Sequence, residues 1–539
     1  MSQADPSAPV NEPNLAYLPG SPERAALKSA LVRMAGERIE IPMVVGGTAS
    51  MTATRATVVI PHDHGHVLGD VAQAAGADVQ RAVDAALAAR HDWAARSLGA
   101  RAAVFLRAAD LLATSWRPVI NAATMLGQSK TVVQAEIDAA AELVDFWRFN
   151  VHFAQALEAE QPISTPVASN RLDYRPLEGF VYAITPFNFT SIAGNLPTAP
   201  ALMGNVVVWK PAASSMLAAH YLMRLLIEAG LPPGVINMVA GSAAEVTDVV
   251  LTSPHLAGVH FTGSTQVFDG IWARIGRDLG RYRAYPRVVG ETGGKDFVVA
   301  HTSADPQALA VALARGAFEY QGQKCSAASR AYVPQSMWPD VRDRVVAMMR
   351  GMQVGDPADF RTFTGAVIDR KAFDRISGYI DDARQNARIL QGGTARGDVG
   401  YFVDPALVET DDPGYRLMRE EIFGPVLTVY PYPDGDWVQT LDLVNRTSPY
   451  ALTGAVFARD PEAVQVAMAT LRDAAGNFYV NDKPTGAVVG QQPFGGARRS
   501  GTNDKAGSKW NLVRWVSPRT IKITHQPPTD WRYPYMSEA

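Results

Sequence analysis

The chain has 539 residues, more than one hydrophobic core usually serves, so we expect two or three domains. With 50 Lys and Arg against 53 Asp and Glu, the formal net charge is −3, which argues against nucleic acid or an anionic membrane as a partner. The single cysteine, Cys325, excludes an internal disulfide framework and any site with several cysteine ligands. We therefore expect a cytoplasmic protein without a metal site.

The N-terminal region predicts a helix followed by a β-hairpin. Residues 1–14 resemble neither a signal peptide nor a transit peptide, and no apolar run reaches the roughly 20 residues that span a bilayer. Residues 21–36 have a helical rhythm, and residues 38–45 and 53–60 predict two strands around the Gly46-Gly47 turn. The histidines of PHDHGH at 61–66 follow in a Pro/Gly turn, which favours a strand connection over a metal site.

Long helices are predicted next, over residues 76–97, 101–114 and 129–153. Acidic side chains on the third of them are interpreted as a mainly solvated face or as helix partners, with the alternative that one of them faces a cationic ligand: Glu136, Asp138, Glu142 and Asp145. Residues 162–176 break the helical pattern and predict an extended excursion from the main body.

Strands and helices then alternate, which predicts a parallel, doubly wound α/β sheet. The predicted strands are residues 179–185, 205–209, 235–239, 258–261 and 297–300, and the predicted helices between them are 216–229 and 243–251. Such sheets bind ligands at the carboxyl ends of their strands, where Thr185, Lys210 and Thr262 fall. No G-x-G-x-x-G motif occurs, although a helix that opens after Gly263 and Ser264 could hold a phosphate.

A second α/β unit is predicted around Cys325. Its helices are expected over 306–317 and 335–352, and its strands near 330–333, 365–368 and 426–430. The extended run 512–524 is suited to pairing with another strand or subunit. The thiol of Cys325 is a candidate nucleophile, and the alternative from this stretch alone is a small buried apolar residue.

Ordered motifs along the chain resemble the aldehyde dehydrogenase superfamily: PFNF at 186, WKPA at 209, FTGST at 261, ETGGK at 291, GQKC at 322 and EEIFGPV at 420. The resemblance implies a Rossmann-type NAD-binding domain, an α/β catalytic domain and a small β oligomerisation flap. We place the first in residues 1–161 and 179–296, the second in 297–505, and the flap with a C-terminal strand in 162–178 and 506–539.

The resemblance also assigns three catalytic residues. Cys325 is the nucleophile, and the Asn188 amide with the Cys325 backbone N–H stabilises the oxyanion. Glu291 is the base that activates water, whereas its alternative role is to pair with a lysine such as Lys295. The presence of this glutamate argues against a coenzyme-A-acylating enzyme.

For the cofactor, the resemblance implies NAD. It places Lys210 and Glu421 on the riboses and Ser264 on the pyrophosphate, and it puts further residues along the crevice: Thr185, Trp209, Gly263, Thr265 and Phe423. The chain has Ala213 where an acidic residue often binds the adenosine 2′-hydroxyl, so weaker use of NADP is also expected.

A finer resemblance, to the Δ1-pyrroline-5-carboxylate dehydrogenase family, rests on QAEIDAAAELVDFWRFN at 134, FEYQGQKCSA at 318 and TGAVVGQQPFGGARRSGTNDKAG at 485. It implies that Gly486, Ala487 and Ser326 bind the α-amino and α-carboxylate groups of the substrate. Phe189 and Phe494 would then wall its aliphatic chain, although each phenylalanine can equally be core packing.

These resemblances imply NAD-dependent oxidation of L-glutamate γ-semialdehyde to L-glutamate in proline breakdown, through a cysteine thiohemiacetal and thioester. Two alternatives remain: an aldehyde dehydrogenase for another semialdehyde such as succinate semialdehyde, and a catalytically silent binding or structural homologue. We expect a monofunctional homodimer or higher homo-oligomer, with proline dehydrogenase as a potential channelling partner.

Overall fold

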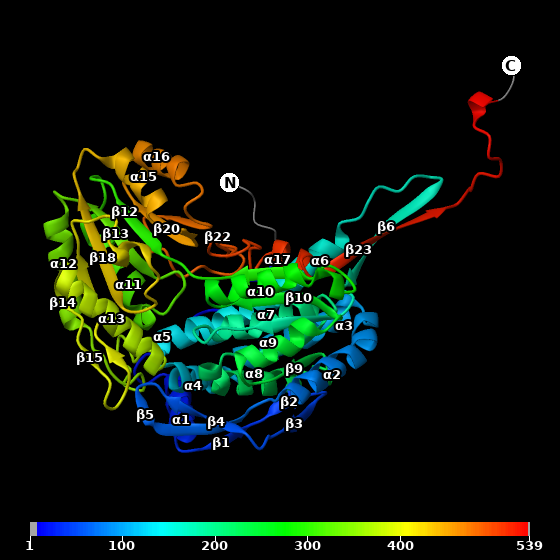
Figure 1. Ribbon diagram of the computed structural model, residues 1–539, viewed down its shortest axis with the longest axis horizontal. Helices are drawn as coiled ribbons and strands as arrows, with labels where there is room; N and C mark the ends of the chain where they lie inside the picture. The colour runs from blue at the N-terminus through cyan, green and yellow to red at the C-terminus, as the bar shows by residue number, and fades with distance from the viewer. Residues whose placement is uncertain (1–7, 537–539) are drawn as a thin grey trace.

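The computed structural model describes residues 8–536, in which two seven-stranded sheets form adjoining halves and a long two-stranded extension projects from one of them (Figure 1). The predicted ranges that reach into residues 1–7 and 537–539, including the start of the N-terminal segment, lie partly outside the described residues. Within residues 8–536, no helix is both long enough and apolar enough to cross a membrane.

The first sheet is parallel over five strands and ends in an antiparallel hairpin. In spatial order its strands are β11 (Arg287–Glu291), β10 (Leu256–Thr262), β7 (Phe180–Ile184), β8 (Val206–Lys210), β9 (Ile236–Met238), β2 (Met43–Val45) and β3 (Thr48–Ser50). All residues of β8 and β10 are buried, as expected for continuous apolar strands covered on both faces. This sheet confirms the predicted doubly wound arrangement.

Helices pack around this sheet and make up most of the N-terminal half (Figure 1). They are α1 (Pro22–Ala35), α2 (Gly76–Ala95), α3 (Leu98–Ala113), α4 (Arg117–Gln128), α5 (Val132–Ala135), the π-helix η1 (Glu136–Glu142), α6 (Leu143–Ala159), α7 (Thr190–Leu202), α8 (Met216–Glu228), α9 (Ala243–Thr252) and α10 (Thr265–Arg277), with 3₁₀ turns η2 (Ala213–Ser215) and η3 (Leu279–Arg281). The sequence did not predict α7, because Pro197 and Pro200 lie inside it and proline normally interrupts a helix.

The second sheet carries the segment that follows Cys325. Its order is β14 (Arg388–Gly392), β17 (Ala406–Glu409), β18 (Val426–Tyr432), β13 (Ala328–Pro334), β12 (Asp296–Ala300), β20 (Thr453–Phe457) and β21 (Asn477–Val480). Its helices are α11 (Pro306–Phe318), η4 (Glu319–Gly322), α12 (Trp338–Gly351), α13 (Arg370–Asn386), α14 (Arg416–Arg419), α15 (Trp437–Thr447) and α16 (Pro461–Thr470). The predicted strand at 365–368 is wrong, since this segment joins no sheet.

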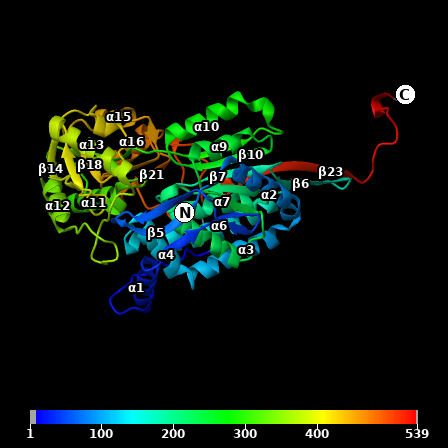
Figure 2. The ribbon, with the colours of Figure 1, turned by 60° about the horizontal axis from the view of Figure 1, so that its bottom comes forward.

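The extension consists of β6 (Ala168–Pro176) paired antiparallel with β23 (Val516–Thr524) over nine residues each. Figures 1 and 2 both show it reaching away from the two sheets, and the chain continues past it through η5 (Pro534–Met536). Two short strand pairs complete the fold: β15 (Ala395–Arg396) with β16 (Phe402–Val403), and β19 (Tyr450–Ala451) with β22 (Ala497–Arg498). The short helix α17 (Lys509–Val513) precedes β23. The predicted extended excursion and the predicted pairing run are thus partners of each other.

The predicted N-terminal hairpin is wrong in its pairing. The Gly46-Gly47 turn joins β2 to β3, whereas β4 (Arg55–Ile60) pairs with β5 (Asp63–Ala72) and β1 (Ile39–Ile41) runs parallel to β5. Several short alternating runs follow one another here, so alternation alone does not select the partner of each strand.

The histidines that follow lead into β5 and take separate partners. His62 contacts Ser129, whereas His64 stacks on Tyr401 and His66 donates to the carbonyl of Ala35. Across residues 8–536, no group of three or more His, Cys, Asp and Glu side chains is placed to hold a metal ion.

Candidate active site

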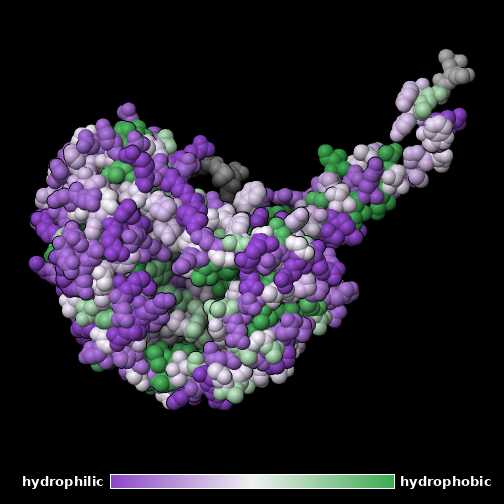
Figure 3. Space-filling model, in the orientation of Figure 1, coloured by the Kyte–Doolittle hydropathy of each residue, from purple (hydrophilic) through white to green (hydrophobic). Residues whose placement is uncertain are grey.

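Polar residues from several strands meet at one edge of the first sheet. Cα pairing places Lys210 of β8 opposite Ile184 of β7, directly before Thr185, and places Glu291 of β11 opposite Thr262 of β10. These are the carboxyl ends of parallel strands, where open α/β sheets bind ligands. The surface is hollowed between the two halves of the molecule (Figure 3).

Cys325 follows a backbone turn with three consecutive residues of positive φ. Tyr320 has φ 48°, Gln321 has φ 53° and Gly322 has φ 63°. The first two are costly conformations for residues with a Cβ, so surrounding contacts must hold them. The Gln321 amide supplies two, since its Nε2 donates to the carbonyls of Ser129 at 3.0 Å and Ala366 at 2.8 Å. These hydrogen bonds therefore fix the backbone turn that positions the Cys325 thiol.

The thiol is partly exposed and surrounded by acidic groups. Burial raises the pKa of Cys325, and the charges of Asp296, Glu291 and Glu421 raise that pKa further. The backbone around it is crowded, because a Cβ on Gly294 would lie 2.1 Å from the Cys325 carbonyl oxygen. The resting thiol is thus protonated at neutral pH, and attack on a carbonyl requires a nearby base.

The structure brings Asn188 next to this turn. Its side chain is buried, and its Nδ2 donates to the carbonyl oxygen of Gln323 at 2.9 Å. The acceptor, Gln323, precedes Cys325 by two residues. Asn188 is therefore held near the thiol although it lies far from Cys325 in the sequence. A fixed amide donor at this place can stabilise an oxyanion formed next to Cys325.

Glu291 lies at the end of β11, where its Oε2 accepts a hydrogen bond from the Gly496 backbone N–H at 3.2 Å. Burial raises the pKa of Glu291, while the Gly496 hydrogen bond and the charge of Lys505 oppose that rise. The alternative pairing with Lys295 is not found, because the Lys295 ammonium donates to Ser329 Oγ at 2.6 Å. A carboxyl group with a raised pKa is suited to accept a proton near neutral pH.

Ser326 connects the nucleophile to a distant loop. Its hydroxyl lies 2.8 Å from the Thr485 hydroxyl, and both are buried. The next residues, Gly486 and Ala487, are more exposed, and Gly486 has φ +96°, which favours glycine. Three of the predicted substrate residues, Ser326, Gly486 and Ala487, thus lie in the same region as the thiol.

The two predicted wall residues have different surroundings. The Phe189 ring lies 4.4 Å from the Lys130 ammonium, whereas Phe494 exchanges backbone hydrogen bonds with Ala506. Both side chains are only partly buried, so neither is an ordinary core residue.

Behind Phe189 lies a buried charged network that the sequence did not predict. Lys130 Nζ donates to Asp138 Oδ2 at 2.6 Å, and the Asp138 carboxylate accepts the backbone N–H groups of Thr190 and Ser191 at the start of α7. Ser191 also donates to Glu142, whose pKa burial raises to about 8. The solvated-face interpretation is therefore wrong for these residues, and also for Glu136 and Asp145, which are buried.

The network fixes the segment that carries Asn188. An aspartate at a helix N-terminus satisfies backbone donors and stabilises the helix dipole. Because α7 begins two residues after Asn188, Asp138 and Lys130 hold the amide in place from behind. No local pattern signalled this role, since the helical spacing of acidic residues is the same on a solvated face.

Several of the predicted cofactor residues lie at the carboxyl ends of the first sheet or contact the segments beside them. Trp209 Nε1 donates to Thr185 Oγ1 at 3.0 Å, and Thr265 Oγ1 accepts from the Gly293 N–H at 3.3 Å. Glu421 Oε1 accepts from the Gly294 N–H at 2.8 Å. Phe423, which has φ 55°, packs edge-on against Phe187 at 5.9 Å between ring centroids.

Two features of this edge of the sheet fit a dinucleotide. Lys210 is buried, its ammonium makes only a long 3.4 Å contact to the Pro211 carbonyl, and burial lowers its pKa, so a ribose hydroxyl would give it a better partner. Ser264 caps the 13-residue helix α10, and a Cβ on Gly263 would meet the Phe261 ring at 2.7 Å. A helix N-terminus preceded by a bare backbone can hold a pyrophosphate.

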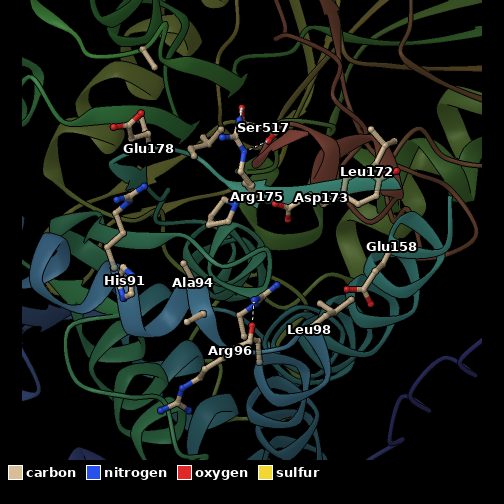
Figure 4. Close-up of a pocket in the computed structure, with 18 of the residues that line it drawn as sticks. His91, Ala94, Arg96, Leu98, Glu158, Leu172, Asp173, Arg175, Glu178 and Ser517 are labelled. Carbon is tan, nitrogen blue, oxygen red and sulfur yellow. Dashed lines mark hydrogen bonds between the residues drawn. The ribbon is translucent and has the colours of Figure 1, made fainter. Parts of the chain in front are cut away.

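A separate cavity lies at the base of the extension. It measures about 980 Å³ and is lined by strand β6 on one wall and by α2 and α3 on the other. Figure 4 shows Arg175 and Asp173 facing Ala94 and Leu98 across it. None of the predicted site residues lines this cavity.

Comparison with known proteins assigns the family. Residues 48–521 match the model of the aldehyde dehydrogenase family. The mouse protein named Delta-1-pyrroline-5-carboxylate dehydrogenase, mitochondrial, is 53% identical over 530 residues, which cover 98% of this chain and 94% of that protein. Because that name places the mouse protein in mitochondria, the cytoplasmic location of this chain stays a prediction.

Solved structures of similar proteins support the same family assignment. The Delta-pyrroline-5-carboxylate dehydrogenase from Mycobacterium tuberculosis bound with NAD has a TM-score of 0.95 and 56% identity, covering 98% of both chains. Proline utilization A from Bdellovibrio bacteriovorus has a TM-score of 0.92 and 29% identity, covering 98% of this chain and 55% of that one. This chain belongs to the aldehyde dehydrogenase family.

Proposed function

We propose that this protein oxidises L-glutamate γ-semialdehyde, the open form of Δ1-pyrroline-5-carboxylate, to L-glutamate with NAD. The observation that carries the proposal is the contact between Ser326, next to the nucleophile, and Thr485, next to Gly486 and Ala487. It supports the proposal because hydroxyls and a glycine-containing loop next to the residue that follows the nucleophile are suited to bind an amino acid head group. The similarity to the mouse and mycobacterial enzymes supports the same substrate.

In the first half of the reaction, the Cys325 thiol loses its proton and sulfur adds to the aldehyde carbon. We assign this proton to solvent water, because Cys325 is partly exposed, and reserve Glu291 for the second half of the reaction. The Asn188 amide and the Cys325 N–H then stabilise the oxyanion of the thiohemiacetal. NAD held at the carboxyl ends of the first sheet would accept a hydride from the substrate carbon, and the group left on Cys325 is then a thioester.

In the second half, water adds to the thioester carbonyl carbon while Glu291 takes the proton of that water. The carbon–sulfur bond breaks, glutamate leaves, and Cys325 is regenerated. Burial raises the pKa of Glu291, which makes its carboxylate a stronger base for this proton transfer.

We propose that the unit around the first sheet holds NAD through Thr185, Trp209, Lys210, Gly263, Ser264 and Thr265, and that Glu421 and Phe423 contact it from the unit around the second sheet. The unit around the second sheet then carries the nucleophile. Ala213, in the 3₁₀ turn after Lys210, offers no carboxylate to repel a 2′-phosphate, which supports weaker activity with NADP.

We further propose a homodimer or higher homo-oligomer that forms through the β6–β23 extension. Apolar side chains are exposed on and beside it, among them Ile163, Val167 and Ile523 (Figure 3). Exposed apolar surface of this kind marks an interaction site. A proline dehydrogenase as channelling partner is supported by the match to proline utilization A, a chain of which this protein covers 55%.

Initial rates on a panel of aldehydes, with NAD and with NADP, test the substrate and cofactor. We expect the highest kcat/KM for L-glutamate γ-semialdehyde with NAD. A higher kcat/KM for succinate semialdehyde would favour the alternative dehydrogenase, and no oxidation of any aldehyde would favour the silent homologue.

Changing Asn188 to alanine removes one oxyanion donor. We expect kcat to fall about 10²–10³-fold with little change in KM, because the donor acts mainly on the transition state. Steady-state kinetics measures both constants, and Asn386→Ala, at the exposed end of α13, is the control. An unchanged kcat in Asn188→Ala contradicts the assignment.

Changing Ala487 to tryptophan fills the head-group site. We expect KM for the semialdehyde to rise about tenfold or more, because overpacking costs roughly 1–3 kcal/mol. The control is Val399→Trp, at an exposed position outside the site. If KM in Ala487→Trp equals the native value, the head group binds elsewhere.

A further inference from the structure

Lys505 is anchored beside Glu291 and has no role in the mechanism above. Its ammonium donates to the carbonyl oxygens of Gly476 at 2.8 Å and Gly495 at 3.1 Å, and it contacts Asn477 Oδ1 at 3.4 Å. All three acceptors are neutral oxygens. The backbone of Lys505 has φ 51°, an uncommon conformation for a residue with a Cβ.

These contacts bear on the segment that holds Glu291. The Gly495 carbonyl oxygen accepts a hydrogen bond from the Lys505 ammonium. The N–H of the same peptide group, which belongs to Gly496, donates to Glu291. The Gly495 N–H is tied to Asn477 Oδ1 at 3.2 Å, which the Lys505 ammonium also contacts. The Lys505 ammonium and the Glu291 carboxylate therefore bind opposite ends of one peptide group.

Gly495 lies between the Glu291 carboxylate and the Lys505 backbone. A Cβ placed on Gly495 would lie 3.0 Å from Asn503 Oδ1 and 3.2 Å from both Glu291 Oε1 and the Lys505 backbone nitrogen. A larger residue here would displace the Glu291 carboxylate or the backbone that carries Lys505.

The charges act on each other in both directions. The Lys505 ammonium lowers the pKa of Glu291 against the effect of burial, and the Glu291 carboxylate raises the pKa of Lys505 against the same effect. The other charged groups near Glu291 are acidic or neutralised. Asp504 raises its pKa but is paired with Arg514 at 3.2 Å, and Asp296 and Glu421 lie around Cys325. Lys505 is therefore the cation that favours the ionised form of Glu291.

We propose that Lys505 is a positioning residue for thioester hydrolysis: it holds the Gly495–Gly496 peptide against Glu291 and supplies a positive charge near this base. This inference rests on the proposed function. In the step concerned, water adds to the thioester carbon, its proton passes to the Glu291 carboxylate, and the Cys325 thiolate leaves. No electrons are transferred in this step.

The test compares Lys505→Met, which lacks the charge and the donors, with Lys505→Arg, which keeps both. Lys509→Met is the control, because Lys509 pairs with Glu160 on the surface. For each variant, stopped-flow absorbance records the first turnover of NADH and the steady-state rate, between pH 5 and pH 9. The substrate is L-glutamate γ-semialdehyde with saturating NAD.

For Lys505→Met we expect an NADH burst of about one equivalent per active site, followed by a steady-state rate lower by about tenfold or more. Loss of the cation raises the pKa of Glu291, so the acidic limb of the kcat profile moves to higher pH. In Lys505→Arg the acidic limb of the kcat profile should stay within a few tenths of a pH unit of its native position. Lys509→Met should behave as the native protein.

An unchanged acidic limb in Lys505→Met would overturn the inference. So would a first turnover that is lost as fully as the steady-state rate, since Lys505 would then serve folding or substrate binding instead of hydrolysis. A native protein that forms no NADH from the semialdehyde overturns the proposed function itself, which separates the two failures.

Discussion

Replacing Cys325 with alanine reduces NADH formation from L-glutamate γ-semialdehyde by about 10⁴-fold or more, because no other group near the turn can form the thioester. The chain has no second cysteine that could substitute. The fold should persist, since the side chain is partly exposed and the turn is held by Gln321 and Gly322. Initial rates measured directly by NADH absorbance, together with the circular dichroism spectrum, check both statements.

Alkylation provides the control for this result. Because Cys325 is the only thiol, iodoacetamide adds at most one group to the native protein and none to Cys325→Ala. Loss of native activity should follow the extent of this labelling. Activity of Cys325→Ala near the native level, or a fully alkylated native protein that stays active, contradicts nucleophilic catalysis by this residue.

Changing Glu291 to glutamine should allow the first half of the reaction and block the second. The glutamine Oε1 can still accept the Gly496 N–H, but it cannot take a proton from water. We expect one NADH per active site at most, then a steady-state rate lower by about 10²–10⁴-fold. Rapid-mixing absorbance separates the two phases, and Glu178→Gln, which alters a surface pair with Arg283, should match the native protein.

The native pH profile gives an independent check on Glu291. Its ionised form is the active base, so kcat rises with pH as the group loses its proton. Because burial raises the pKa of Glu291, this acidic limb should lie above the ordinary range of a glutamate, and it should vanish from the residual rate of Glu291→Gln. A limb at the ordinary glutamate pKa would assign the profile to another group.

Strands β7, β8, β9 and β10 of the first sheet were predictable because each is a short apolar run bounded by turn residues. Parallel strands buried on both faces have this signature, and β7, β8 and β10 show it. The carboxyl ends of these strands follow from their boundaries, so the sequence alone predicts that Thr185 and Lys210 share one edge of the sheet. Strand β11 was not predicted, and the predicted strand at 297–300 is β12 of the second sheet. The pairing of β1 with β5 was not predictable, because short alternating runs fit several partners.

The candidate active site was also only partly predictable from the sequence. The motifs predict Cys325, Glu291 and Asn188 as catalytic residues. They do not predict that the acidic residues of η1 are buried, because a helix with charges every three or four residues has the same sequence pattern whether its charged face is solvated or buried. The roles of Asp138 and Lys130 depend on the N–H groups of α7, and α7 itself contains two prolines. Such an arrangement depends on tertiary contacts that no local pattern encodes.

The role of Lys505 was equally absent from the sequence patterns. It lies in a loop between two glycines, Gly501 and Gly507, and a charged residue in such a loop usually faces solvent. Its position became meaningful only when the fold placed it across Gly495 from Glu291.

The central claim is that Cys325 forms a thioester with the γ-carboxyl carbon of glutamate. Intact-protein mass spectrometry of Glu291→Gln, quenched after mixing with L-glutamate γ-semialdehyde and NAD, tests it directly. The account predicts a mass increase of one glutamyl group per chain, located on Cys325 by peptide mapping and absent without NAD. An unchanged mass while NADH is formed, or a glutamyl group on any other residue, would contradict it.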